Sequence, residues 1–316
     1  MSIPSIGRLA LLFAIFVAAF AALASPPREV TAEPYVQGPS SCKECHRDEY
    51  KTWEETKHFK SYRTAHKAED AKKISIAVSG KKNMKRNKNC TVCHYSNEQK
   101  KPDGKSKIKY GPACESCHSA SSVWESIHYD YGGPTIKREA EASDHKAKRI
   151  ADSSAAGLIW SSMNYDIAAN CMKCHGLART DVSGEAFGKM LEAGHPINQS
   201  FEVVMFSQGL MRHWRDKRSP AELAQLYIAG QAAKLVSATE AAANSADANY
   251  QAMQTKRADD AKAALQPVAQ AAALIQSPSD TNARKMMQDI GQQDLSGAVG
   301  GQIPCAGPDK TNLWQC

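Results

Sequence analysis

The stretch Cys114-Glu-Ser-Cys117-His118 follows a pattern that occurs four times in this chain of 316 residues. The other three copies are Cys42-Lys-Glu-Cys45-His46, Cys90-Thr-Val-Cys93-His94 and Cys171-Met-Lys-Cys174-His175. We number the four copies motifs 1 to 4 in chain order, so the first stretch quoted is motif 3. A chain of this composition would contain on the order of 0.01 such motifs by chance, so four of them indicate a shared chemical role.

The spacing within each motif suits covalent attachment of haem. Two thiols three residues apart can form thioether bonds to the two vinyl groups of one haem, and the adjacent histidine can then bind the iron. Structural zinc and a disulfide scaffold are the alternatives, but neither explains a histidine directly after every second cysteine. We therefore predict four haem c groups, with iron ligands His46, His94, His118 and His175.

The N-terminal 24 residues have the features of a secretory signal. Arg8 is the one charge, an apolar run extends from Leu9 to Phe20, and Ala22-Leu23-Ala24 precedes Ser25. We predict cleavage after Ala24 and a periplasmic location, with an uncleaved membrane anchor as the alternative. Attachment to a membrane is then expected only through that anchor or through a partner.

Composition divides the mature chain into two predicted regions. All ten histidines and eight of the ten cysteines precede Ser219. We predict a tetrahaem domain at 25–218 and an Ala-rich helical region at 219–316, and we expect Cys305 and Cys316 to form a disulfide. The fold class is predicted to be mostly α with little regular sheet, with haems packed in close pairs and a C-terminal helical hairpin or bundle.

The C-terminal region begins with a helix-start signal, Ser219-Pro220-Ala221-Glu222. Helices are predicted to run from there to about Ala243, from about Ala246 to Leu265, and from about Ser279 to Ile290. The region contains no catalytic motif. It is expected to pack against the haem domain or to form an assembly surface, so an oligomer is one expectation.

Four irons need up to four further axial ligands, and bis-histidine ligation suits electron transfer. Six histidines remain for these positions: His58, His66, His128, His145, His195 and His213. A stretch without Gly or Pro from Asp48 to Lys67 predicts a single helix. On this helix His58 and His66 would lie about 80° apart, so they are not expected to face one iron. Methionine is the alternative ligand type, with candidates Met84, Met163, Met172, Met190, Met205 and Met211.

The formal charge is +7, including the charge of Arg8, and haem propionates would offset most of it. Segments 81–88 and 100–107 are strongly basic and are predicted to be exposed loops. They are either a solvated surface or a docking patch for an acidic redox partner. Nucleic acid is not an expected partner of an exported protein.

Residues 41 to about 218 resemble the cytochrome c554 family of tetrahaem cytochromes. The resemblance rests on motif 1 followed by Trp53-x-x-Thr56-x-His58, on Gly111-Pro-Ala before motif 3, and on motif 4. The stretch from Gly194-His195-Pro196 through Phe201-Glu202 to Arg212-His213 also resembles relatives of that family. The chain departs from the family pattern in having Ser119-Ala120 after motif 3, where Gly-Pro-Gly is common, and in its longer C-terminal extension.

The resemblance implies ligands that cross between motifs. It pairs His58 with the haem at His175, His128 with the haem at His46, and His213 with the haem at His118. The haem at His94 is the one whose sixth position is open in the family's type member. Here His195, His66 or His145 could fill that position.

These observations predict an exported carrier that moves electrons between two redox proteins. The alternatives are an enzyme acting on a small nitrogen or sulfur compound at an open haem iron, and a haem-bearing subunit of a filament or membrane redox complex. We found no Ser-His-Asp arrangement, phosphate loop or nucleotide fingerprint in the sequence.

Overall fold

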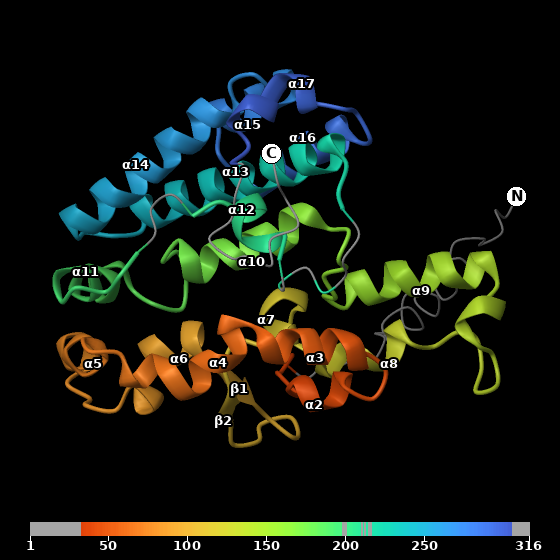
Figure 1. Ribbon diagram of the computed structural model, residues 1–316, viewed down its shortest axis with the longest axis horizontal. Helices are drawn as coiled ribbons and strands as arrows, with labels where there is room; N and C mark the ends of the chain where they lie inside the picture. The colour runs from red at the N-terminus through yellow and green to blue at the C-terminus, as the bar shows by residue number, and fades with distance from the viewer. Residues whose placement is uncertain (1–32, 198–200, 210, 212, 214–216, 305–316) are drawn as a thin grey trace, which may run out of the picture. The chain divides into compact units, whose positions relative to one another are not determined.

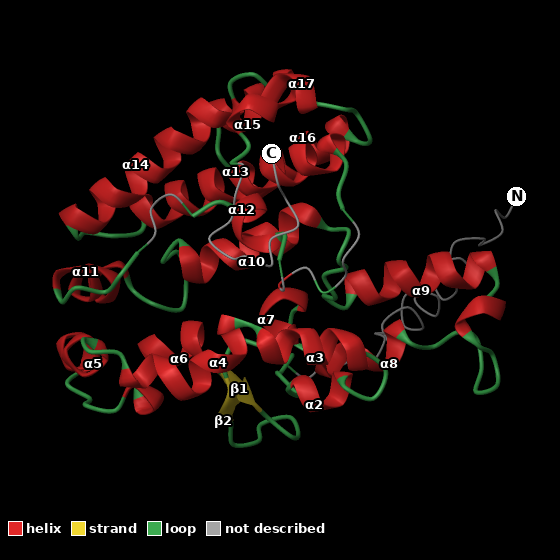
Figure 2. Ribbon diagram, in the orientation of Figure 1, coloured by secondary structure: helices red, strands yellow, loops and turns green. Residues whose placement is uncertain are grey.

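The computed structural model describes residues 33–197, 201–209, 211, 213 and 217–304. The chain divides into Met1–Glu33 and a compact unit, Pro34–Cys316, to which all the described helices and strands belong. The predicted signal sequence at 1–24 and the predicted Cys305–Cys316 disulfide lie outside the described residues. The described part is mostly helical with one two-stranded sheet, which confirms the predicted fold class (Figure 2).

Short helices carry the four motifs. Motif 1 begins at the end of α2 (Pro39–Cys42), motif 2 ends α6 (Lys88–His94), motif 3 is α7 (Cys114–His118), and motif 4 ends α10 (Asn164–His175). Residues three and four apart share one face of a helix. In the three helical motifs, therefore, both cysteines and the histidine project to the same side.

The other elements connect and cover these helices. Before motif 4 they are α3 (Arg47–Glu55), α4 (Lys57–Thr64), η1 (Ala65–Lys67), α5 (Ala71–Ser79), η2 (Met84–Arg86), β1 (Ser96–Glu98), β2 (Lys107–Tyr110), η3 (Ser121–Val123), α8 (Glu125–His128), η4 (Arg138–Ala140) and α9 (Ser143–Ala155). After it come α11 (Gly184–Glu192), α12 (Val203–Ser207), α13 (Pro220–Ala243), α14 (Ala248–Leu265), η6 (Ala269–Ala271), α15 (Ala272–Gln276), α16 (Asp280–Ile290), α17 (Ser296–Val299) and η7 (Gly300–Gln302). Strands β1 and β2 pair antiparallel, with Asn97 opposite Ile108.

The predicted single helix from Asp48 to Lys67 is wrong, because the chain turns at Thr56. This residue has an extended backbone, with φ −72° and ψ 160°, and separates α3 from α4. Its hydroxyl donates to the Trp53 carbonyl and accepts from the Phe59 amide, so it caps the second helix. Threonine side chains compete with helical hydrogen bonds in this way. The predicted angle between His58 and His66 therefore does not apply, since they lie on different elements.

The C-terminal helices stack on motif 4. In Figure 1, α14 lies along α13, and α10 lies along the opposite side of α13. Small alanines such as Ala168 of α10 and Ala232 of α13 are completely buried in the core that joins these helices. That core includes residues on both sides of the predicted boundary at 218/219. No helix in the described part of the chain is long and apolar enough to cross a membrane.

The predicted start of α13 is confirmed. The Glu222 amide donates to the Ser219 hydroxyl, and the Ser219 amide donates to the Glu222 carboxylate, which makes a capping box. The predicted ends at Ala243, Leu265 and Ile290 also match the observed helices.

Replacing Ala168 with Leu should lower the free energy of unfolding of the holoprotein by about 1–3 kcal/mol, because the buried site has no room for the larger side chain. Urea denaturation followed by circular dichroism measures this. Ala147→Leu on the exposed face of α9 is the matched control and should change the free energy by less than about 0.5 kcal/mol. Equal effects of the two variants would contradict close packing at Ala168.

Candidate functional site

Three motif histidines each lie opposite a second histidine from a distant segment. The ring centroids are 6.3 Å apart in the pair His46–His128 and 5.9 Å apart in the pairs His58–His175 and His94–His195. A metal ion lies about 2 Å from a nitrogen that binds it, and that nitrogen lies about 1.1 Å from the centre of its ring. Two rings that share one metal ion would therefore have centroids about 6 Å apart. Each observed gap therefore suits one metal ion between two imidazoles.

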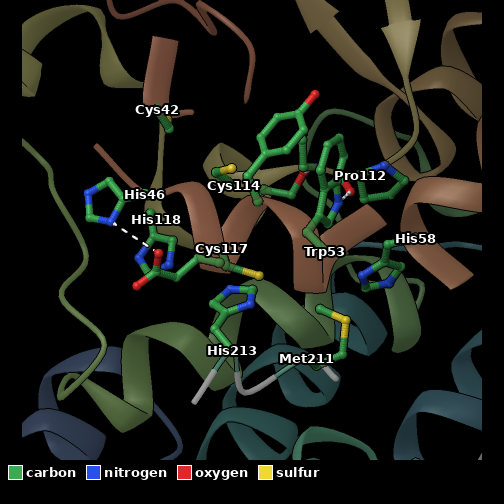
Figure 3. A pocket seen from close by; sticks show the side chains of 14 residues that line it. Cys42, His46, Trp53, His58, Pro112, Cys114, Cys117, His118, Met211 and His213 are labelled. Carbon is green, nitrogen blue, oxygen red and sulfur yellow. Dashed lines mark hydrogen bonds and ion pairs between the residues drawn. The ribbon is translucent and has the colours of Figure 1, made fainter. Parts of the chain in front are cut away.

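The fourth pair of histidines lines a pocket (Figure 3). His118 and His213 lie there together with cysteines of motifs 1 and 3. His213 has a φ of 69°, an unusual value for a residue with a side chain, and such strain often marks a functional position.

The donor set suits a planar group that supplies most of the iron's ligands itself. Within the described residues, no three of the His, Cys, Asp and Glu side chains are grouped as a bare metal ion requires. The site instead provides imidazoles in twos, with thiols nearby. Haem c needs this combination, because its ring fills four positions and leaves two axial ones.

Desolvation favours the neutral, metal-binding form of seven of these imidazoles. Burial, with smaller contributions from neighbouring histidines, lowers the pKa of His58 and of His94 to about 4. Burial also lowers the pKa of the other paired histidines His118, His128, His175, His195 and His213. No proton then has to leave these rings at neutral pH before a metal can bind.

Backbone carbonyls and aromatic rings orient several imidazoles. The Nδ1 atom of His118 is 2.7 Å from the Ile159 carbonyl, and that of His128 is 2.5 Å from the Glu125 carbonyl. These contacts make Nδ1 the protonated nitrogen and leave Nε2 for a metal. The ring of Phe201 stacks on His175, with centroids 4.3 Å apart.

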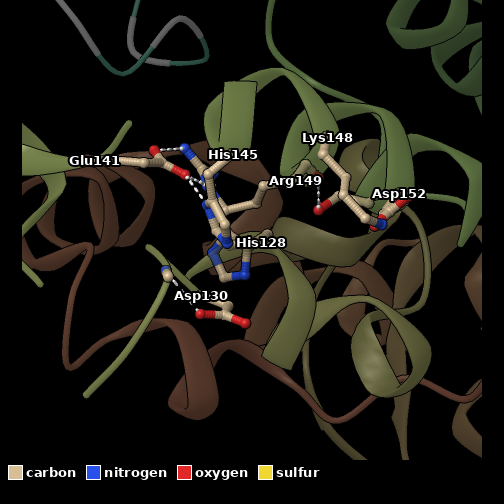
Figure 4. Close-up of polar contacts among 9 residues, drawn as sticks. His128, Asp130, Glu141, His145, Lys148, Arg149 and Asp152 are labelled. Atoms are coloured by element: carbon tan, nitrogen blue, oxygen red, sulfur yellow. Dashed lines mark hydrogen bonds and ion pairs between the residues drawn. The ribbon is translucent and has the colours of Figure 1, made fainter. Parts of the chain in front are cut away.

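The chain carries a buried ion pair behind His128 (Figure 4). Arg149 donates to the His128 carbonyl and forms two hydrogen bonds with the Glu141 carboxylate, all at 2.7 Å. His145 Nδ1 lies 2.8 Å from the same carboxylate. The hydrogen bond from Arg149 holds the pKa of Glu141 at about 2. Sequence reasoning missed this cluster, because only the folded loop between residues 129 and 142 brings its members together.

The structure separates the three candidates for the position opposite His94. Among the described residues, His195 forms the ring pair with it, whereas His145 lies in the cluster with Glu141 and Arg149. His66 lies in η1, near Lys85.

Four of the six methionine candidates have other contacts. Met84, Met172 and Met190 are buried in apolar clusters, and the sulfur of Met163 accepts from the Trp160 amide. Met211 lines the pocket beside His213, and Met205 lies on α12.

A second residue that sequence reasoning missed is Arg257 of α14. Its side chain is 2% exposed and donates to the Gly176 carbonyl, directly after motif 4, and to Gln254. It also lies 3.4 Å from the sulfur of Met172 within that motif's helix. No carboxylate among the described residues forms an ion pair with it, and burial lowers its pKa to about 10. The C-terminal region therefore brings an uncompensated positive charge to motif 4.

The cysteine thiols show which motifs are neighbours. The thiols of Cys42 and Cys114 lie close enough to shift each other's pKa, as do those of Cys93 and Cys174. Asn170 of α10 donates to the Cys117 carbonyl, which joins motif 3 to motif 4. The motifs thus follow one another in space in the order 1, 3, 4, 2.

Comparison with known proteins identifies one family. Residues 41–119, which contain motifs 1 to 3 and His58, match the family described as cytochrome c554 and c-prime. No curated protein and no solved structure gives a match. Motif 4 and the C-terminal helices lie outside the matched segment.

Replacing Arg149 with Met should lower the free energy of unfolding at pH 7, because the Glu141 carboxylate and the His128 carbonyl lose their donor. Wild-type stabilisation from Glu141 is fully present above its ordinary pKa of about 4.5 and is lost as the pH falls through about 2. The difference between the two proteins should therefore shrink between about pH 5 and pH 2. Urea denaturation across this range tests the idea.

The control is Lys148→Met at the neighbouring exposed ion pair with Asp152, where we expect a change within about 1 kcal/mol. A difference between wild type and the Arg149 variant that stays constant on acidification would contradict the role of Glu141.

Proposed function

We propose that this chain is a tetrahaem electron carrier of the periplasm. Residues 41–119 match the cytochrome c554 family, whose c-type cytochromes hold covalent haem and transfer electrons. Each motif would attach one haem c through its two cysteines. Electrons would enter from one redox protein and leave to another.

The observation that carries this proposal is that each motif histidine has a second histidine near it. His46 would share an iron with His128, His118 with His213, His175 with His58, and His94 with His195. Once bound, the haem irons supply the one-electron chemistry by alternating between the ferric and ferrous states. Two imidazoles per iron leave no position for a substrate, which favours a carrier over an enzyme.

The order of the motifs in space supports a single relay. Neighbouring thiols link motif 1 to motif 3 and motif 2 to motif 4, and the α7–α10 contact links motif 3 to motif 4. The proposed path therefore runs from His46 through His118 and His175 to His94. Motifs 1 and 2 are its two ends, where partners exchange electrons.

The remaining contribution of the protein is to keep the axial rings in place. The backbone acceptors at Ile159 and Glu125 fix two rings, and Phe201 covers a third. Arg149 secures the segment that carries His128. Little movement of the ligands is then needed when an electron passes, as a carrier requires.

The first experiment is a pyridine-haemochrome count, together with optical spectra of the dithionite-reduced holoprotein before and after carbon monoxide. We expect four haems per chain and no spectral change with carbon monoxide, because both axial positions of every iron are filled. His195→Ala should open the iron at His94, so that about one haem per chain binds carbon monoxide.

His145→Ala is the matched control for this experiment, and it should leave the wild-type spectrum unchanged. A count below four would overturn the proposed cofactor content. Carbon monoxide binding by the wild-type protein would instead show an open iron and favour a reaction on a small molecule.

Replacing Arg257 with Gln should lower the reduction potential of one haem, because the buried positive charge beside motif 4 favours the ferrous state. We expect a shift of tens of millivolts, where about 59 mV corresponds to a tenfold change in a one-electron equilibrium. A spectroelectrochemical titration measures it. Arg257→Lys should shift the potential less, and Lys256→Gln at the exposed neighbouring position should not shift it. Equal potentials in the wild-type and Gln proteins would contradict this role.

A further inference from the structure

The positive charge of the chain is concentrated in one segment. Residues 57–110 contain 16 Lys and Arg residues but 4 Asp and Glu residues. The excess in this segment is larger than the formal net charge of +7 of the whole chain, so the remainder is net negative. A general requirement for solubility would not explain so uneven a distribution.

These charges face solvent and are largely without partners. All but one of the 16 basic residues are exposed, and the exception, Lys85, lies over the ring of Tyr62 at 3.7 Å. Lys109 pairs with Glu98 at 2.9 Å, and within the described residues no other member of the group forms an ion pair. We call the exposed Lys and Arg side chains of residues 57–110 the basic surface.

The basic surface belongs to the elements that surround motif 2. Helix α6, which carries this motif, contacts α4, α5, η2 and β1, and these elements with β2 and the loops between them hold the basic residues. The surroundings of motif 1 are different. Residues 41–55 contain three basic and five acidic residues, and Tyr129, beside His128, is 52% exposed. The two ends of the proposed relay thus present different surfaces.

We propose that the basic surface docks an acidic electron-transfer protein at the His94 end of the relay. The inference rests on the proposed electron-carrier function. Unpaired surface charges of one sign attract a partner of opposite charge and raise its association rate by about 10- to 1,000-fold at low salt. The motif 1 end has no such charge excess, so the partner that uses it should be less sensitive to salt.

The test is stopped-flow reduction of the oxidised holoprotein by a reduced plant-type [2Fe–2S] ferredoxin, used as a small acidic probe. The second-order rate constant should fall about tenfold or more as the ionic strength rises from about 0.01 M to about 0.3 M, because salt screens surface charges. Lys81→Glu, Lys82→Glu and Lys88→Glu combined should lower the low-salt rate constant several-fold. The matched control combines Lys256→Glu, Lys262→Glu and Lys285→Glu on the C-terminal helices and should react like wild type.

Full reduction by dithionite with unchanged spectra shows in each variant that the haems are intact, which separates this test from that of the proposed function. The docking proposal is overturned if ionic strength has no effect or if both triple variants are slowed equally. It is also overturned if the charge-reversal variant of the basic surface loses binding to phosphatidylglycerol vesicles but reacts with the ferredoxin as fast as wild type. The surface would then serve a membrane.

Discussion

The pairing of imidazoles from distant segments is the constraint on which the rest of the structure depends. His58 follows motif 1 but lies opposite the histidine of motif 4, and His195 follows motif 4 but lies opposite that of motif 2. Each gap between two imidazoles therefore forms only when the fold brings its two segments together. Because desolvation lowers the pKa of these four rings, each favours the neutral form that could bind a metal.

Much of this arrangement could be predicted from the sequence, because covalent chemistry and helix caps act locally. The four motifs needed no tertiary information, and Ser219 with Glu222 marked the start of α13 correctly. The break at Thr56 was missed, because a threonine inside a polar helix gives the same pattern as one that caps the next helix. The cluster of Arg149 and Glu141 was missed as well, since Glu141 lies before the first residue of α9 and the contact depends on how the chain enters that helix. The ligand pairings came from the family resemblance and remain predictions.

The Ala-rich C-terminal helices differ from the haem-bearing part in composition but share its core. Tyr250 and Gln254 of α14 donate to the Leu177 and Gly176 carbonyls just after motif 4, and Arg257 joins them there. A cation beside the last carbonyls of a helix also stabilises that helix through its dipole. The extension therefore supports α10 mechanically and places a charge where it would act on an iron bound at motif 4.

The two ends of the proposed relay differ in the surfaces that they present to partners. This difference implies nothing about the reduction potentials. A chain of irons can pass electrons in either direction, so its direction depends on which partner reaches which end. Charge around motif 2 would favour encounters with acidic proteins, whereas Tyr129 offers an exposed ring next to His128, the proposed ligand at the other end. Apolar contacts depend little on salt, whereas charge steering is screened within about 10 Å at 0.1 M. The proposed partners at the two ends should therefore differ in how strongly their reactions depend on salt.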